Sequence, residues 1–338
     1  MQVTRGLRGI VAVALFLLSV ASAVTAKYSG GTGEANDPYR IATAADLIVL
    51  GETPGDYDKH FVLTADIDLD PKLPGRKVFD KAVIAPAGSS FTGLFDGKGH
   101  TILRLTIEGD RLLGLFGSLQ SGAEVKNLGV VDVNITGSGQ SVGGLVGYIE
   151  MGAVTGCYSS GSVSGPGSGV GGLVGDNRGS IAASYSSSEV SNSASGGFEG
   201  ERAGGLVGSN SGSIGTSYSR GSVSGGMDAG GLVGYNGGTI AASYSTGAVS
   251  GIWLAFVGGL VGGQSRGGIL HSFWDMETSG VSASGGGAGK TTAEMQRAKT
   301  FLNAYWDFVG ESKNGTEDVW WIDEGKDYPR LWWEATGK

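Results

Sequence analysis

The sequence contains one cysteine, Cys157, and three histidines, His60, His100 and His271, among 338 residues. A lone cysteine excludes an internal disulfide framework. The histidines lie far apart and form no His-Glu-x-x-His pattern, which argues against a zinc peptidase site. Because Cys157 stands where other repeat units carry serine, we interpret it as a small strand residue and not as a nucleophile. The sequence therefore predicts no catalytic residue, no metal and no cofactor.

Charge is also scarce, with 17% charged residues and a net charge of −8. Nucleic-acid binding needs a concentrated basic face, so this class of partner is excluded. The one long apolar run, residues 10–20, follows two arginines and precedes a stretch of small residues, which is the pattern of a signal peptide. We expect cleavage after Ala23 or Ala26, no membrane span thereafter, and a secreted or cell-surface location.

Glycine, in contrast, is abundant, with 65 residues, and it recurs in a fixed pattern. A Gly-Leu-Val-Gly motif, or a close variant, repeats every 26 to 33 residues, beginning at Gly114, Gly144, Gly172, Gly205, Gly231 and Gly259. A second landmark follows 13 or 14 residues later, at Leu128, Tyr158, Tyr185, Tyr218, Tyr244 and Phe273. Repeats of this length cannot bury a core alone and have to stack.

The repeat length and the short apolar segments predict an all-β fold, a right-handed parallel β-helix (β-solenoid) with short helical and aromatic caps at both ends. Propeller blades of about 40 residues are longer than these units. Within one unit, Ile181, Ala183 and Tyr185 alternate, so we expect them on one face. Asn177 and its counterparts in later units favour left-handed turns and a stacked amide ladder.

The phrase Gly-Gly-Leu-Val-Gly-x-Asn-x-Gly-x-Ile-x-x-Ser-Tyr-Ser, at residues 171–186 and again from Gly204 and Gly230, resembles the GLUG-motif repeat. The resemblance covers residues 112–280. It implies a bacterial secreted or cell-surface protein, since such repeats occur in adhesin-like proteins and in the non-catalytic part of some immunoglobulin A peptidases. A likeness of fold carries no functional site.

Four regions follow: a signal peptide over 1–26, an N-terminal cap and first coils over 27–111, the repeat β-helix over 112–281, and a linker with an aromatic C-terminal cap over 282–338. Thr43 is expected to cap a short helix. Thr291 and Glu294 form a capping-box pattern that predicts a helix to about Leu302. Five of the seven tryptophans lie in the last 33 residues. Their rings are expected to close the end of the core, with a carbohydrate-stacking face as the alternative.

Two further stretches carry candidate chemistry. The apolar loop of Ile252, Trp253, Leu254 and Phe256 replaces a polar turn of other units, so we predict a ligand or partner contact there, with packing onto the rod as the alternative. Asp66, Asp68 and Asp70 alternate along a strand, which fits either a calcium site or a solvated strand face. The glycine-rich stretch 286–291 imitates a phosphate loop but lacks its first glycine and its preceding strand.

The sequence thus favours a non-catalytic, secreted or surface-displayed repeat protein. It would act in adhesion or binding, as a monomer, with a cell-surface glycan or an envelope protein as partner. The alternative is an extracellular polysaccharide lyase or hydrolase of β-helix fold. An enzyme of that kind would need a cleft with clustered carboxylates or basic residues on successive coils.

Overall fold

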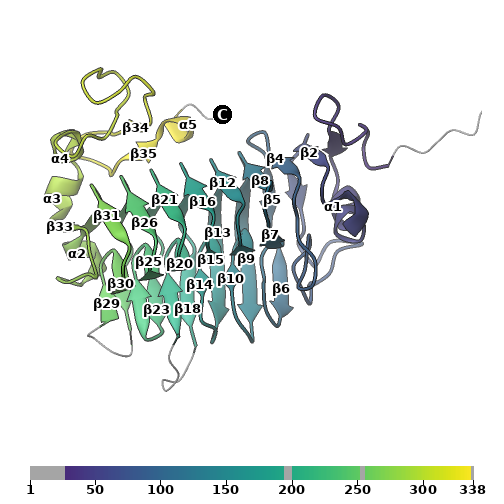
Figure 1. Ribbon diagram of the computed structural model, residues 1–338, viewed down its shortest axis with the longest axis horizontal. Coiled ribbons are helices and arrows are strands. Elements are labelled where there is room, and N and C mark those ends of the chain that lie inside the picture. The colour runs from purple at the N-terminus through teal and green to yellow at the C-terminus, as the bar shows by residue number, and fades with distance from the viewer. Residues whose placement is uncertain (1–26, 194–199, 252–255, 336–338) are drawn as a thin grey trace, which may run out of the picture.

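The chain folds as a stack of coils that follow one another along one axis in the order of the sequence (Figure 1). The computed structural model describes residues 27–193, 200–251 and 256–335. Strands of successive coils pair in parallel, and the one antiparallel strand pair among these residues, β34 with β35, lies in the C-terminal segment. The prediction of an all-β parallel β-helix is confirmed.

Four parallel sheets run along the stack within the described residues. The nine-stranded sheet contains β1 (Tyr39–Ile41), β2 (His60–Leu63), β4 (Leu94–Asp96), β8 (Glu124–Lys126), β12 (Ala153–Thr155), β16 (Ser180–Ala182), β21 (Ser213–Gly215), β26 (Thr239–Ala241) and β31 (Gly268–Leu270). The six-stranded sheet contains β7 (Phe116–Leu119), β11 (Val146–Ile149), β15 (Val174–Asn177), β20 (Val207–Asn210), β25 (Val233–Asn236) and β30 (Val261–Gln264). The five-stranded sheet contains β10 (Val142–Gly143), β14 (Val170–Gly171), β19 (Arg202–Gly204), β24 (Asp228–Gly230) and β29 (Val257–Gly258).

The thirteen-stranded sheet contains β3 (Ile67–Asp68), β5 (Thr101–Leu103), β6 (Thr106–Gly109), β9 (Gly129–Gly137), β13 (Tyr158–Gly165), β17 (Tyr185–Ser186), β18 (Glu189–Asn192), β22 (Tyr218–Ser219), β23 (Val223–Gly225), β27 (Tyr244–Ser245), β28 (Val249–Ser250), β32 (Phe273–Asp275) and β33 (Ala288–Lys290). The antiparallel pair is β34 (Trp320–Trp321) and β35 (Arg330–Leu331). The helices are α1 (Ala44–Gly51), the 3-10 turn η1 (Pro54–Asp56), α2 (Met276–Ser279), α3 (Thr292–Met295), α4 (Ala298–Leu302) and α5 (Trp332–Ala335).

The register places the tyrosines of successive coils in one line on the thirteen-stranded sheet. Tyr185 pairs with Tyr158 on one side and with Tyr218 on the other, and Tyr218 pairs with Tyr244. The prediction that these landmarks share a sheet is confirmed. Leu128 is the exception, because Tyr158 pairs with Gly129. Leu128 is fully buried in the core, so it does not hold a tyrosine position.

The tyrosines point out of the coil, contrary to the expected alternation. Ile181 is buried in the core, whereas Tyr185 is half-buried and belongs to a separate apolar cluster. Ala183 has φ 46°, so the backbone turns left-handed between the two strands and Ser184 takes the inward position. The prediction that Asn177 adopts the left-handed conformation is therefore wrong: Ala183 adopts it, and Asn177 ends a strand instead.

Polar ladders run through the interior beside the apolar core. Asn177 donates to Oδ1 of Asn210 at 2.8 Å, Asn210 to Asn236 at 2.7 Å, and Asn236 to Oε1 of Gln264 at 3.0 Å. The expected amide ladder is confirmed, and Gln264 extends it by one coil. Each amide is satisfied by its neighbour, which removes the cost of burying it.

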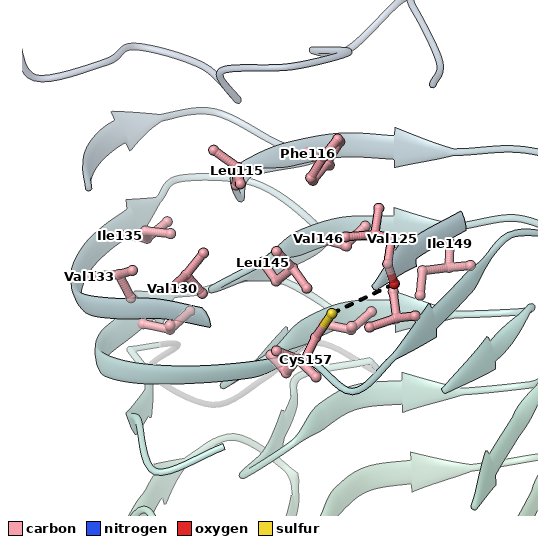
Figure 2. Close-up of a cluster of buried hydrophobic side chains, with 14 of the residues drawn as sticks. Leu115, Phe116, Val125, Val130, Val133, Ile135, Leu145, Val146, Ile149 and Cys157 are labelled. Atoms are coloured by element: carbon pink, nitrogen blue, oxygen red, sulfur yellow. Dashed lines mark hydrogen bonds between the residues drawn. The ribbon is translucent and has the colours of Figure 1, made fainter. Parts of the chain in front are cut away.

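Cys157 heads a second ladder, made by serines. Its backbone N–H donates to Oγ of Ser184 at 3.1 Å, and the next coils repeat this bond from Ser184 to Ser217. Figure 2 shows the thiol among apolar side chains, with Sγ 3.6 Å from the carbonyl oxygen of Val125. Burial raises the pKa of the Cys157 thiol to about 12. The inert, serine-like role expected for Cys157 fits this position.

The glycines of the motif sit where coils approach most closely. A Cβ on Gly172 would lie 2.2 Å from the carbonyl oxygen of Gly205, and one on Gly205 would lie 2.2 Å from that of Gly231. No side chain fits at such a distance. The spacing between stacked strands thus explains why the repeat keeps glycine here.

At the N-terminal end, Thr43 caps α1 through a full capping box with Asp46, as predicted. Leu47 and Leu50 of this helix are buried against the first coils. The helix therefore covers the open end of the apolar core.

At the C-terminal end, the stretch expected to be a flexible linker is bonded to the last coil. Gly259 donates to the carbonyl oxygen of Ala283 at 2.9 Å, and Ser284 Oγ accepts from the N–H of Val261 at 2.9 Å. Strand β33 then pairs with β32. This stretch, and not the aromatic segment, covers the core at that end. Beyond it, the capping box of Thr291 is present, but the extended backbone of Arg297 divides the expected helix into α3 and α4.

Candidate ligand-binding groove

Four outward tyrosines form a column along the thirteen-stranded sheet, here called the tyrosine column: Tyr158, Tyr185, Tyr218 and Tyr244. Neighbouring rings lie nearly parallel, with centroids 5.1, 4.8 and 4.9 Å apart in chain order. These distances follow the spacing of stacked coils. The column presents aromatic surface outside the core, where something has to cover it.

The C-terminal segment covers most of the column by running back over the coils (Figure 1). Its buried side chains join Tyr218, Tyr244 and Phe273 in an outer aromatic cluster with Met295, Phe301, Trp306, Phe308, Trp320 and Leu331. The expected end cap is thus a flank cover. The physical reason is the left-handed turn before each tyrosine, which turns the rings outward and so places their partners outside the coil.

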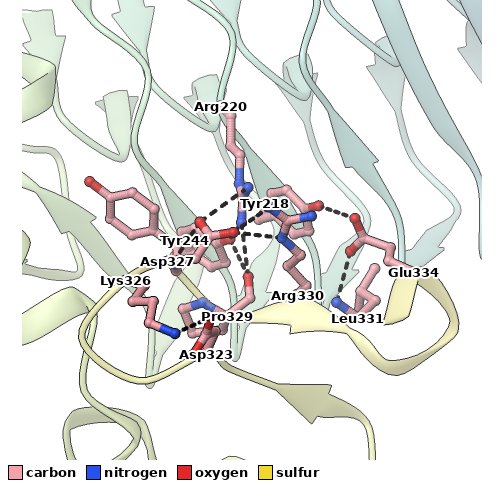
Figure 3. A network of polar contacts seen from close by, with 11 residues as sticks. Tyr218, Arg220, Tyr244, Asp323, Lys326, Asp327, Pro329, Arg330, Leu331 and Glu334 are labelled. Atoms are coloured by element: carbon pink, nitrogen blue, oxygen red, sulfur yellow. Dashed lines mark hydrogen bonds and ion pairs between the residues drawn. The ribbon is translucent and has the colours of Figure 1, made fainter. Parts of the chain in front are cut away.

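Polar contacts fix this segment in place (Figure 3). Tyr218 donates to Oε2 of Glu334 at 2.8 Å, and the backbone N–H of Leu331 donates to Oε1 of the same glutamate at 2.8 Å. Arg220 donates to Oη of Tyr244 at 3.0 Å and lies 3.6 Å from a carboxylate oxygen of Asp327. Burial raises the pKa of Glu334. The end of the segment is therefore anchored beside the column.

A groove of about 670 Å³ opens where the tyrosine column ends, and we call it the Tyr158 groove. It is lined by Lys98, Gly99, Asn127, Gly156, Tyr158, Tyr185, Arg330, Trp332, Trp333 and Glu334. The preceding coil has Gly129 in the tyrosine position, and a Cβ there would lie 2.4 Å from the ring of Tyr158. The column therefore stops at Tyr158, and the glycines beyond it leave space.

The two adjacent tryptophans at the groove have different roles. The ring of Trp333 packs across Tyr158 at 5.9 Å and Tyr185 at 5.7 Å. Trp332 is 45% exposed although it lines the groove. Its backbone N–H donates to the carbonyl oxygen of Val319 at 3.0 Å. One ring thus anchors the segment while the other is presented to solvent on a fixed backbone.

The residues selected from the sequence lie elsewhere or outside the described residues. Ile252, Trp253 and Leu254 belong to the stretch that is not described, and Phe256, 44% exposed, does not line the Tyr158 groove. The Trp332 site was missed. A signal was present, because two adjacent tryptophans cannot both pack on the same face of a short segment.

The three aspartates expected to be a calcium site or a strand face are bound by basic partners. Asp68 pairs with Arg104, which also lies 3.6 Å from Asp70, and Asp66 accepts from the N–H of Thr101 at 2.8 Å and contacts His100 at 3.2 Å. The hydrogen bond from Thr101 is the leading cause that lowers the pKa of Asp66. In the part of the chain that is described, no three acidic, histidine or cysteine residues gather as metal ligands.

A second, more polar groove of about 420 Å³ lies on the outer face of the six-stranded sheet. Its Arg202 lies over the ring of Tyr235 at 4.1 Å and donates to Ser209 at 3.1 Å. Asp176, at its centre, is bonded to Ser141, and burial raises the pKa of Asp176. Tyr148, the ring that lines this groove, is half-buried, whereas Trp332 at the first groove is exposed.

This geometry defines a repeat protein of the parallel β-helix class with an aromatic segment docked on its flank. Residues 138–164 match the GLUG motif. The chain therefore carries a GLUG motif within its repeat region.

Two relatives match part of the chain. The chain is 33% identical over 159 residues to Halomucin of Haloquadratum walsbyi, a match that covers 45% of this chain and 2% of Halomucin. It is 32% identical over 137 residues to a candidate Gly-rich membrane protein of Evansella cellulosilytica, which covers 38% of this chain and 15% of that protein. The chain thus spans a small fraction of the length of either relative.

A crystal structure of a candidate immunoglobulin A1 protease from Bacteroides ovatus resembles most of the chain, with a TM-score of 0.57 and 18% identity. The match covers 90% of this chain and 95% of that one. At this identity the likeness concerns the fold alone. Among the helices of the described residues, none has the length and apolar character to cross a membrane.

Proposed function

We propose that this chain is a secreted or surface-displayed, non-catalytic binding protein, and that the Tyr158 groove binds a saccharide. The observation that carries the proposal is Trp332, a large aromatic side chain held 45% exposed at the mouth of a groove. The signal-peptide pattern supports export. A relative named as a Gly-rich membrane protein supports a surface location.

The groove offers the two kinds of contact that sugar rings use. The indole face of Trp332 and the edge of Tyr158 supply apolar surface for the C–H face of a pyranose. Asn127 and Lys98, which also line the groove, supply polar groups for hydroxyls. Concave sites of this kind combine aromatic walls with a few convergent polar groups.

The carboxylates beside the groove support a binding role over a catalytic one. Glu334 already accepts hydrogen bonds from Tyr218 and from the N–H of Leu331, and Asp66 accepts from Thr101. Common glycoside hydrolysis needs one carboxyl free to donate a proton and a second in a defined position. A lyase or hydrolase remains the competing function, because two carboxylates lie near a phenol here: burial is the main cause that raises the pKa of Tyr158, and Asp66 and Glu334 add to it.

The test is titration calorimetry of the protein without residues 1–26 against polysaccharides selected on a glycan array, comparing Trp332→Ala with Tyr305→Ala. Tyr305 is 74% exposed and does not line the groove, so it is the matched control. We expect Trp332→Ala to weaken binding by about tenfold or more, and the control to leave it unchanged.

Three outcomes would contradict the proposal. One is an equal loss in both variants. Another is a loss confined to the double variant Trp253→Ala with Phe256→Ala, which would move the site to the loop selected from sequence. The third is release of reducing or unsaturated ends from the bound polysaccharide, which would favour the enzyme.

A further inference from the structure

We infer that the saccharide taken by the Tyr158 groove is an uncharged polymer, and that uronate or sulfated chains are rejected. The inference rests on the proposed function and specifies its ligand class. It is carried by the charges at the groove, each of which already has an ion-pair or hydrogen-bond partner within the protein.

Each basic group that lines the groove pairs with a carboxylate of the protein. Nζ of Lys98 lies 3.0 Å from Oδ2 of Asp96, a carboxylate that is itself buried. The guanidinium of Arg330 pairs with Asp327, which a second arginine, Arg220, also contacts. A polyanion that approached either cation would therefore also meet its partner carboxylate, which would repel it.

The acidic groups at the groove offset its basic groups, so no positive charge is in excess there. Glu334 lines the groove, and no ion pair of 4 Å or less joins it to a base within the described residues. Together with Asp96 and Asp327 this makes three carboxylates, which balance the three cations Lys98, Arg330 and Arg220. Recognition of uronates or sulfates uses arginine or lysine in excess of acids, as charge-assisted and often bidentate pairs.

The available hydrogen-bonding groups suit hydroxyls. Nδ2 of Asn127 is spent on Oδ1 of Asp96 at 3.0 Å, which points its carbonyl oxygen the other way. A Cβ on Gly156 would lie 3.1 Å from Oδ1 of Asn127, so glycine at this position keeps that oxygen accessible. A carbonyl oxygen accepts a hydrogen bond from a hydroxyl and repels a carboxylate. With the exposed face of Trp332, this makes a site for a neutral ring.

The experiment compares neutral and acidic oligosaccharides of equal length by titration calorimetry. The neutral probes are gluco-, xylo- and manno-oligosaccharides, the acidic probe is oligogalacturonate, and each is measured at about 20 mM and about 300 mM NaCl. We expect a neutral probe to bind at least about tenfold more tightly than oligogalacturonate, with an affinity that salt changes less than about twofold.

Charge variants sharpen the result. In Asp96→Asn the ammonium of Lys98 loses its charged partner, so oligogalacturonate binding should increase relative to neutral binding in the same variant, a ratio that controls for the hydrogen bond that Asp96 accepts from Asn127. Tighter binding of oligogalacturonate by the unmodified protein, weakened by salt, would overturn the inference and leave the proposed function standing. Absence of binding to all of these probes would contradict the proposed function itself.

Discussion

The interior of the coils and the outer aromatic cluster are two apolar regions held together in different ways. Inside, each side chain lies between its counterparts in the coils before and after, as Asn210 lies between Asn177 and Asn236. Outside, Tyr218 and Tyr244 pack against one segment that returns from the end of the chain. The interior is supported along the whole stack, whereas the outer cluster depends on a single docking event. We therefore expect the outer region to loosen alone.

The largest expected effect is from a cavity in the interior. Leu206 is fully buried, and Leu206→Ala should lower the free energy of unfolding by about 2–5 kcal/mol in urea titrations followed by far-UV circular dichroism. Leu331→Ala, a matched change in the outer cluster, should leave that transition nearly unchanged and increase proteolysis of the C-terminal segment. Equal losses in the two urea transitions would show that the regions unfold as one unit.

A smaller loss is expected from breaking the amide ladder. Asn210→Ala removes the acceptor of Asn177 and the donor to Asn236, and should cost about 1–3 kcal/mol of unfolding free energy. Ser211→Ala, at the adjacent exposed position, should stay within about 0.5 kcal/mol of the parent. If the two variants were equally stable, the ladder would be no part of what holds the coils together.

High pH should separate the two regions. Burial raises the pKa of Tyr185, Tyr218 and Tyr244, and that of Tyr328 to about 12, above the ordinary value of 10.0. Above pH 10 the unfolded or undocked tyrosines release protons first, so the stability gained from docking is present below pH 10 and declines as pH rises toward 12.

We expect tryptophan fluorescence, which reports on the docked segment, to change over that range before the far-UV signal of the coils does. In the interior of the coils, burial also raises the pKa of the Cys157 thiol. Changes in both signals at the same pH would contradict separate loosening.

How far the sequence determines each region follows from the same difference. The register of Tyr185 with Tyr218 could be predicted because stacking repeats the motif, and local sequence is enough for the capping box of Thr43. The outward direction of the tyrosines could not be predicted from the sequence, because it depends on a left-handed backbone conformation at Ala183, which alanine does not favour. The Trp332 site arises from a contact between segments far apart in the chain, which no repeat period encodes.

The central claim is that the Tyr158 groove is where this protein meets its ligand, and a crystal structure of the protein with a bound neutral oligosaccharide tests it most directly. The account predicts a sugar ring on the indole of Trp332, with a hydroxyl donating to Oδ1 of Asn127. A ligand found instead at Phe256, or in the polar groove beside Arg202, would contradict it.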